Sequence, residues 1–126
     1  MYTKEAKRVL NIEADAIKDL TKKLGDNFDR AIQILSRSKG RVVLTGMGKT
    51  GIIAQKISAT MSSTGTPSLF LHAAEAIHGD LGRVTKDDVV IALSNSGESE
   101  EIKKLLPLIK KIGVKLISFT EIKNQP

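Results

Sequence analysis

Two polar segments, each directly after an apolar run, carry side chains that can bind an anion. One is GMGKTG at residues 46–51, which follows the apolar run at residues 42–44. The other is SNSGES at residues 94–99, which follows the apolar run at residues 89–93. A helix-like pattern comes after each segment, and the free N–H groups and positive dipole end at a helix start favour phosphate or carboxylate. We therefore expect a phosphorylated ligand near both segments.

The GMGKTG segment shares features with two nucleotide-binding motifs and completes neither. Its glycines match the dinucleotide pattern G-x-G-x-x-G, at Gly46, Gly48 and Gly51. That pattern also needs an acidic residue roughly 20 residues further on, where this chain has Leu71 and His72. The P-loop pattern needs a glycine at the position of Val43. The P-loop is therefore excluded, and the dinucleotide interpretation is weakened.

What remains for this segment is a general phosphate site. Its glycines let the backbone come close to a phosphorylated ligand, and Gly48 and Thr50 stand where a helix begins. Lys49 adds a positive charge at the same point, or a base. We therefore predict that Gly48 and Thr50 contribute to substrate binding and that Lys49 acts beside them.

The SNSGES segment has more hydrogen-bonding groups than a helix start needs. Four polar side chains occupy its six positions, at Ser94, Asn95, Ser96 and Ser99. Gly97 permits a tight turn, and the helix that follows brings free N–H groups to the same place. Ordinary capping of that helix explains one serine. The full set favours a phosphate monoester held by hydroxyl and N–H groups.

A third segment, residues 72–82, holds titratable groups without the spacing of a metal site. It contains two histidines and two acidic residues, His72, Glu75, His78 and Asp80. A single histidine is more often a hydrogen-bonded surface or core group, and the spacing matches no tight metal motif. We therefore expect no metal. With the common strand order, His78 is expected near the other two segments.

Short apolar runs alternate with helix-like patterns along the chain. Apolar residues at spacings of three and four predict helices, at residues 4–24, from Asp26 to Gly40, and at residues 50–63, 73–77 and 99–112. Runs without polar alternation predict strands buried on both faces, at residues 42–44, 69–71, 89–93 and 116–119. Gly25 and Gly113 are expected to end helices in the left-handed conformation. Pro107 is expected to kink or break the last helix near Leu106.

This order of elements indicates an α/β fold with a parallel sheet and helices on both faces. In such folds ligands bind beyond the carboxyl ends of the strands, where the strand order reverses. Both polar segments stand at such ends. No repeat, low-complexity segment or linker interrupts the chain, so we expect residues 1–126 to form a single domain.

Composition narrows the functional classes. The chain has 126 residues, a net charge of +6, no cysteine, one tyrosine and three phenylalanines. Without cysteine there is no disulfide and no thiolate metal ligand. Nothing resembles a signal peptide or a membrane span, so we expect a cytoplasmic protein without membrane contact. The charge fits a solvated surface or attraction of small anions, and the few aromatics and missing motifs disfavour nucleic acid.

Taken together, the motifs resemble those of a known family. GMGKTG at 46–51, STGTPS at 63–68, HGDLG at 78–82 and SNSGES at 94–99 are similar to the sugar isomerase (SIS) domain of D-arabinose 5-phosphate isomerases. The resemblance implies a three-layer α/β/α sandwich of flavodoxin-like type, no organic cofactor, and a homo-oligomer, either dimer or tetramer. It implies interconversion of D-arabinose 5-phosphate and D-ribulose 5-phosphate through an enediol, which feeds synthesis of Kdo for lipopolysaccharide.

The resemblance also implies roles for single residues. The positions matched are Ser94, Asn95, Ser96 and Ser99 for phosphate binding, and Lys49, His78 and Glu101 for catalysis. Moving a proton between the two enediol carbons needs an acid or base, which we assign to Glu101. His78 is then expected to shuttle protons and Lys49 to stabilise the enediolate charge. Taken alone, Glu101 is better explained by the preference for carboxylates at a helix start.

Members of that family continue beyond the point that corresponds to residue 126. They have another strand and more helix, and many then carry a pair of CBS domains; a further glutamate and a histidine thought to act in catalysis lie in that part. We therefore expect an SIS domain that is incomplete at its C-terminus. The alternatives are a non-catalytic sugar-phosphate-binding module, an isomerase of a different sugar phosphate, and a dinucleotide-binding domain.

Overall fold

The computed structural model describes residues 1–94 and 100–120. The chain divides into two compact units, residues 1–33 and residues 34–126. The order of elements is the predicted one with a single addition, because a short 3-10 helix, η1 (Asp80–Arg83), follows helix α4 (Ala73–Ile77).

The first unit consists of helix α1 (Tyr2–Leu20) and most of helix α2 (Asp26–Arg37). No side chain of either helix is buried. Apolar residues of α1 recur at helical spacing and stay exposed; Val9, Ile12, Ile17 and Leu20 form what we call the α1 stripe. The α1 stripe is thus an apolar face that its own unit does not cover.

Helix α1 ends earlier than the sequence predicted. The pattern predicted a helix through residue 24 with a left-handed Gly25 after it, but α1 stops at Leu20 and Gly25 has no positive φ. The N–H groups of residues 21–23 bond instead to carbonyls three residues earlier. These tighter turns take the place of the last helical turn. The prediction was wrong because apolar spacing alone does not separate the two kinds of turn.

The second unit is built on a four-stranded sheet in which all strands are parallel. The strands are β1 (Val42–Gly46), β2 (Ser68–His72), β3 (Val89–Ser94) and β4 (Lys115–Thr120). Their order across the sheet is β2-β1-β3-β4, so β1 pairs with β2 on one side and with β3 on the other. The strand order therefore reverses between β1 and β3, as in doubly wound folds.

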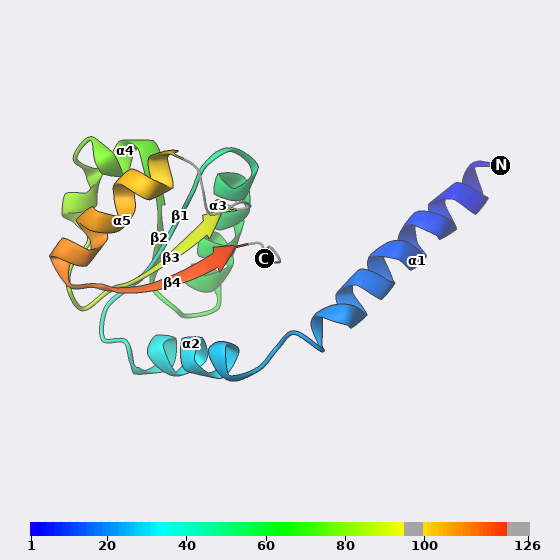
Figure 1. Ribbon diagram of the computed structural model, residues 1–126, viewed down its shortest axis with the longest axis horizontal. Helices are drawn as coiled ribbons and strands as arrows, with labels where there is room; N and C mark the ends of the chain where they lie inside the picture. The colour runs from blue at the N-terminus through cyan, green and yellow to red at the C-terminus, as the bar shows by residue number, and fades with distance from the viewer. Residues whose placement is uncertain (95–99, 121–126) are drawn as a thin grey trace, which may run out of the picture. The chain divides into compact units, whose positions relative to one another are not determined.

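Helices cover both faces of this sheet and make three layers (Figure 1). Helix α3 (Gly48–Ser63) packs on β1 and β2. Helices α4 and α5 (Glu100–Ile112) contact each other on the opposite face, with η1 beside α4. Right-handed crossovers explain why the helices lie on opposite faces of the sheet. The chain moves from β1 outward to β2 and then returns past β1 to β3 and β4, so the direction of the crossover reverses. The predicted α/β/α sandwich is confirmed.

The core of the second unit lies between the sheet and α5. Val43 and Val90, from the two central strands, belong to one cluster with Ile102, Leu105 and Ile109 of α5. None of these five side chains is more than 4% exposed. Burial of an aliphatic side chain of this size stabilises the fold by about 1.5–3 kcal/mol. This contact holds α5 along its length on the sheet.

Pro107 does not break α5. The helix runs through Pro107 without interruption, so the predicted break near Leu106 is wrong. A proline lacks the N–H that would bond to the carbonyl of Lys103. Both Lys103 and Pro107 are exposed, so water can satisfy that carbonyl. The buried Leu105 and Ile109, each 1% exposed, keep the helix on the sheet on both sides of the proline.

A chain of hydroxyl groups ties α3 to the sheet. The Oγ atoms of Ser58 on α3 and Ser68 on β2 lie 2.9 Å apart. The Ser68 hydroxyl in turn donates to the Val42 carbonyl at 2.8 Å. Because Ser68 uses its one proton on Val42, Ser58 is the donor in the first bond. Helix α3 is therefore bonded to β2 and, through it, to β1.

The Asp88 carboxylate joins the amino ends of β1 and β3. Its side chain is 2% exposed and accepts hydrogen bonds from the N–H groups of Arg41 (2.7 Å) and Thr85 (2.8 Å). The Arg41 guanidinium lies 3.4 Å from the same carboxylate. A Cβ at Gly40 would stand 2.5 Å from Asp88, so this position needs glycine. Burial opposes the charge of Asp88, but the donors outweigh it and hold its pKa below the usual value.

Replacing Asp88 by Asn should lower the free energy of unfolding by about 1.5–3 kcal/mol at pH 7. The amide offers one oxygen to two N–H donors and no charge to Arg41. Because folding lowers the Asp88 pKa, the ionised carboxylate stabilises the folded protein at a pH above the pKa of the unfolded state. This stabilisation is lost as the pH falls through the pKa of the folded state. In urea unfolding, the difference between the two proteins should therefore shrink below about pH 4.

The exposed neighbour Asp87 provides the control for this prediction. Asp87→Asn leaves the backbone unchanged and removes one negative charge, as Asp88→Asn does. Unlike Asp88→Asn, it removes no buried hydrogen-bond acceptor. Equal losses in the two variants, or an Asp88→Asn penalty that is the same at pH 7 and pH 3, would contradict the role assigned to Asp88.

Candidate functional site

The carboxyl ends of three strands meet at one edge of the sheet. Gly46, the last residue of β1, is level with His72 on β2 and with Leu93 on β3. Ser94 extends β3 by one further residue and is 7% exposed. Because the strand order reverses between β1 and β3, this edge is the place where doubly wound folds bind ligands.

Helix α3 starts at this edge with unsatisfied backbone donors. Its first helical hydrogen bond runs from the Gly51 N–H to the Met47 carbonyl at 3.2 Å. The N–H groups just before Gly51 therefore have no acceptor inside the helix. The Thr50 hydroxyl donates to the Met47 carbonyl (2.7 Å) and accepts from the Met47 N–H (3.3 Å). Thr50 thus caps the helix start with its side chain, and a ligand there meets backbone N–H groups.

Two of the three glycines in GMGKTG serve packing between the strand and the helix. A Cβ at Gly46 would lie 3.0 Å from the Gly51 nitrogen, and a Cβ at Gly51 would lie 3.1 Å from the Gly46 oxygen. Gly48 differs, because it has φ 56° with nothing within 4 Å of a Cβ. The sequence predicted that all three let the backbone approach a ligand. Close contact of β1 with α3 accounts for Gly46 and Gly51, and the turn into the helix accounts for Gly48.

Replacing Gly46 by Ala should destabilise the second unit by about 1–3 kcal/mol, because the methyl group forces β1 and α3 apart. Thermal unfolding followed by circular dichroism measures the effect. Gly82→Ala is the matched control, since Gly82 has an ordinary φ and open space around its Cβ. If the two variants unfold at the same temperature, the close contact does not limit the packing of α3.

The structure brings Lys49 and Ser94 to the carboxyl edge. Lys49 lies exposed in the first turn of α3, and Ser94 ends β3 directly beside β1. The predicted partners Asn95, Ser96 and Ser99 lie outside the described residues. The described part of the predicted phosphate site therefore consists of Ser94 and the helix start at Gly48 and Thr50, with the predicted catalytic residue Lys49 beside them.

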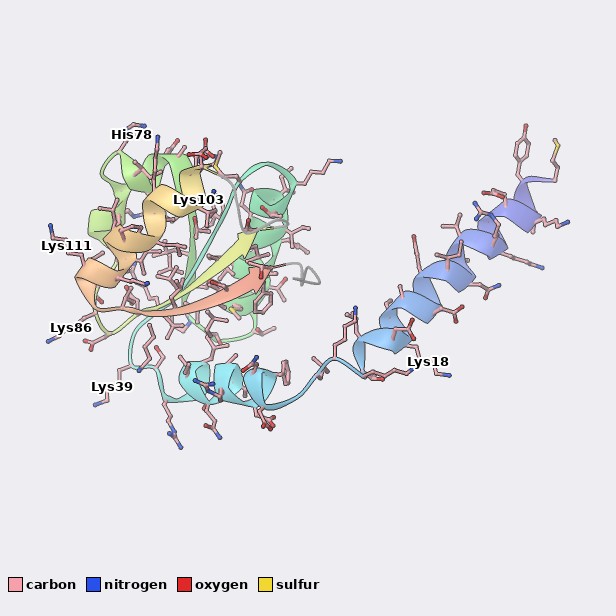
Figure 2. The ribbon with its side chains drawn as sticks, viewed as in Figure 1. Lys18, Lys39, His78, Lys86, Lys103 and Lys111 are labelled. Carbon is pink, nitrogen blue, oxygen red and sulfur yellow. The ribbon has the colours of Figure 1, made fainter. Side chains whose placement is uncertain are left out.

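Glu101 lies at the same edge, and His78 lies at the other end of the short helix α4, which starts at this edge and contacts α5. Glu101 is half-buried in the first turn of α5, which begins beyond the carboxyl end of β3 and runs back to the amino end of β4. His78 is the C-terminal cap of α4, and its exposed side chain points outward (Figure 2). In the described part of the chain, no hydrogen bond or ion pair joins Lys49, His78 and Glu101.

His72 is a polar group of this edge to which sequence reasoning gave no role. Its Nδ1 accepts the Ala74 N–H at 3.2 Å and so caps α4, and its ring lies edge-on to Phe70. Its position directly after an apolar run was the available indication that it ends a strand beside Gly46. Within residues 1–94 and 100–120, no group of three or more His, Cys, Asp or Glu side chains could hold a metal ion.

The sequence pattern of the SIS domain matches residues 34–126, which is most of the chain. The chain belongs to the SIS domain family. Its parallel sheet, reversed between β1 and β3, and its polar carboxyl edge are thus features of an SIS domain.

Arabinose 5-phosphate isomerases are among the proteins similar to this chain. The KdsD enzyme of Pseudomonas aeruginosa is 53% identical over 125 residues, and that of Escherichia coli K12 is 50% identical over 119 residues. These matches cover 99% and 94% of this SIS domain chain and 38% and 36% of the relatives, so the chain spans little more than a third of their length. An Escherichia coli CFT073 protein solved in complex with arabinose 5-phosphate has a TM-score of 0.87 and 48% identity, over 95% of this chain and 64% of that one.

Proposed function

We propose that this SIS domain forms the sugar-phosphate site of a D-arabinose 5-phosphate isomerase. One observation carries the proposal: the groups suited to a phosphorylated sugar gather at the carboxyl edge between β1 and β3, in a chain 48% identical to a protein solved with arabinose 5-phosphate. Lys49, Ser94 and Glu101 come to this edge from three different elements. The family relatives, named arabinose 5-phosphate isomerases, give further support.

In this proposal the phosphate group binds at the β3 end of the edge. Ser94 begins the polar segment, and Asn95, Ser96 and Ser99 supply the further hydrogen-bonding side chains that the sequence places there. The start of α3 at Gly48 and Thr50 adds backbone N–H groups, which favour an anion. The net charge of +6 attracts a doubly charged phosphate ester toward the protein.

The isomerisation then moves one proton between two carbons. The Glu101 carboxylate removes the proton from C2 of the aldose, the enediolate forms, and the same carboxyl group returns a proton to C1 of the ketose. The Lys49 ammonium stabilises the negative charge that develops on the enediolate oxygens. We assign proton transfer between these oxygens to His78 on its motif alone, since no contact in the described part of the chain joins it to the other two.

The test uses residues 1–126 with D-arabinose 5-phosphate in a coupled assay for D-ribulose 5-phosphate. Glu101→Gln keeps the shape of the side chain and removes the base, so it should lower turnover by roughly 10²-fold or more. The neighbouring Glu100→Gln, in an exposed position, should leave turnover near that of the parent. Parent-like turnover in Glu101→Gln would remove Glu101 from the mechanism.

A thermal-shift titration separates binding from catalysis. D-arabinose 5-phosphate should raise the unfolding temperature and D-arabinose should not, because the proposed site binds the phosphate group. A shift without turnover would fit a site that binds the sugar phosphate while the remaining catalytic residues lie outside residues 1–126, or a non-catalytic sugar-phosphate-binding module. A larger shift with another sugar phosphate would support an isomerase of that sugar, and no shift with any of them would refute the ligand assignment.

We also propose that residues 1–126 act as one SIS domain that assembles as a dimer or tetramer. Support for including the first unit comes from a relative whose match covers 99% of the chain. Support for self-association comes from the α1 stripe, where Ile12 is 54% and Leu20 53% exposed. Contiguous exposed apolar surface of this kind commonly marks a protein interface.

Sedimentation velocity at micromolar concentration should therefore show at least a dimer. Ile12→Gln with Leu20→Gln should shift the population toward monomer, because two glutamines cannot replace the apolar contact. Lys7→Gln with Lys18→Gln, on the opposite side of α1, is the matched control and should leave the assembly unchanged (Lys18 in Figure 2). A monomeric parent protein would contradict the proposal.

The cellular role follows from the proposed reaction. We propose that the isomerase works in the cytoplasm and feeds synthesis of Kdo for lipopolysaccharide, as the name KdsD of the relatives suggests. Within the described residues, no helix has both the length and the apolar composition needed to cross a bilayer.

A further inference from the structure

An apolar hollow opens between α4, η1 and the end of α5. Its volume is about 390 Å³, and small-molecule sites in proteins commonly measure about 300–1,000 Å³. Ile77 of α4, Leu81 of η1, and Leu108 and Ile112 of α5 are among the residues that line it. Leu108 is 37% exposed, so part of this apolar wall meets water. The hollow is therefore a surface that an apolar ligand can cover.

Lys111 is the charged residue of this lining in the part of the chain that the structure describes. Its side chain is exposed and points outward from the second unit (Figure 2), so its aliphatic stem lies along the wall while its ammonium group reaches water. Among residues 1–94 and 100–120, no ion pair involves Lys111. The hollow thus has a cation at its rim that the fold does not use in an ion pair.

Further basic side chains lie in the two stretches that line this end of the hollow, residues 80–87 and 108–112. The basic residues there are Arg83, Lys86, Lys110 and Lys111, and the acidic residues are Asp80 and Asp87. Figure 2 shows Lys86 on the same side of the second unit as Lys111. The excess of cations favours an anionic group at the rim over a neutral or cationic one.

The lining and the rim together select a ligand with two parts. An apolar chain gains free energy when it displaces water from the wall of the hollow. A carboxylate at the end of that chain gains a charge-assisted hydrogen bond from the Lys111 ammonium. Nucleic acid does not fit, since no aromatic side chain among the described residues lines the hollow to stack on a base.

We propose that the hollow is a second ligand site, which binds an anion with an apolar chain, such as a medium-chain carboxylate. The chain packs against Leu108 and Ile112, and the carboxylate pairs with Lys111. This site is separate from the proposed sugar-phosphate site, because Lys49 belongs to α3 and lies on the other side of the sheet (Figure 1).

Occupancy of this site acts on His78, because both of its neighbours in the chain, Ile77 and Gly79, line the hollow. A chain packed against Ile77 holds the end of α4, and with it the outward position of His78 (Figure 2). Because we assign proton transfer to His78, an occupied hollow lowers turnover. This effect on turnover rests on the proposed function, whereas binding itself requires no activity.

The experiment is isothermal titration calorimetry of the 126-residue protein with sodium octanoate. Acetate has the same charge without the chain, and 1-octanol has the chain without the charge, so octanoate should bind more tightly than either. In nuclear magnetic resonance spectra, octanoate should shift the amide signals of Gly79 and Gly82, which line the hollow. The amide signals of Gly46 and Gly51 should stay unchanged, and D-arabinose 5-phosphate should not displace octanoate.

Lys111→Gln should weaken octanoate binding by about fivefold, as expected for loss of an exposed ion pair, and leave 1-octanol unaffected. Lys103→Gln is the matched control, because it removes the same charge from an exposed position of α5 that does not line the hollow (Figure 2). Equal weakening in both variants would reduce the interaction to attraction by net charge and overturn the site. So would displacement by D-arabinose 5-phosphate, or Gly79 and Gly82 signals that change with protein concentration alone, since a second copy would then cover the hollow.

In the coupled assay, octanoate should lower kcat and leave KM unchanged, and Lys111→Gln should require about fivefold more octanoate for the same effect. An unchanged kcat at saturating octanoate would contradict the effect on His78. If the parent protein shows no turnover, the proposed function fails, while calorimetry and the amide signals still decide whether the hollow binds the anion.

Discussion

Parallel pairing of β1 with both of its neighbours is the constraint on which the site depends. Because β1 bonds to β2 and β3 in the same direction, the ends of all three strands meet at one edge. The chain leaves each strand at this edge, so α3, α4 and α5 all begin there. Three helix starts then direct backbone N–H groups toward a common region. The sheet thereby collects groups that lie up to about fifty residues apart along the chain into one place, as Lys49 and Glu101 show.

The charged groups at the two edges of the sheet differ in burial and in what they contact. At the amino edge, Asp88 is buried and its oxygens are taken up by Arg41 and Thr85 within the protein. At the carboxyl edge, Lys49 is exposed and Glu101 is half-buried. A charge whose partners are internal stabilises the fold, whereas a charge open to the outside can serve a ligand.

Much of the fold could be predicted from the sequence, because strands buried on both faces require continuous apolar runs such as Val42 to Leu44. The position of Lys49 followed from the strand before it. Other features depend on packing that a linear pattern does not contain. The glycine spacing is the same whether Gly46 contacts a ligand or contacts Gly51. Which contact it makes depends on how closely α3 approaches β1. Likewise, the effect of Pro107 depends on which side of α5 faces water.

Helix α3 is held against the sheet at two separated points. Gly46 meets Gly51 near the start of the helix, and Ser58 bonds to Ser68 two turns further on. With both points held, the helix can neither slide along its axis nor rotate about it without breaking one of them. Its free N–H groups are thus aligned before any ligand arrives, and an anion that binds there loses little affinity to ordering of the protein. For the proposed sugar-phosphate site, the start of α3 is therefore ordered by contacts within the protein itself.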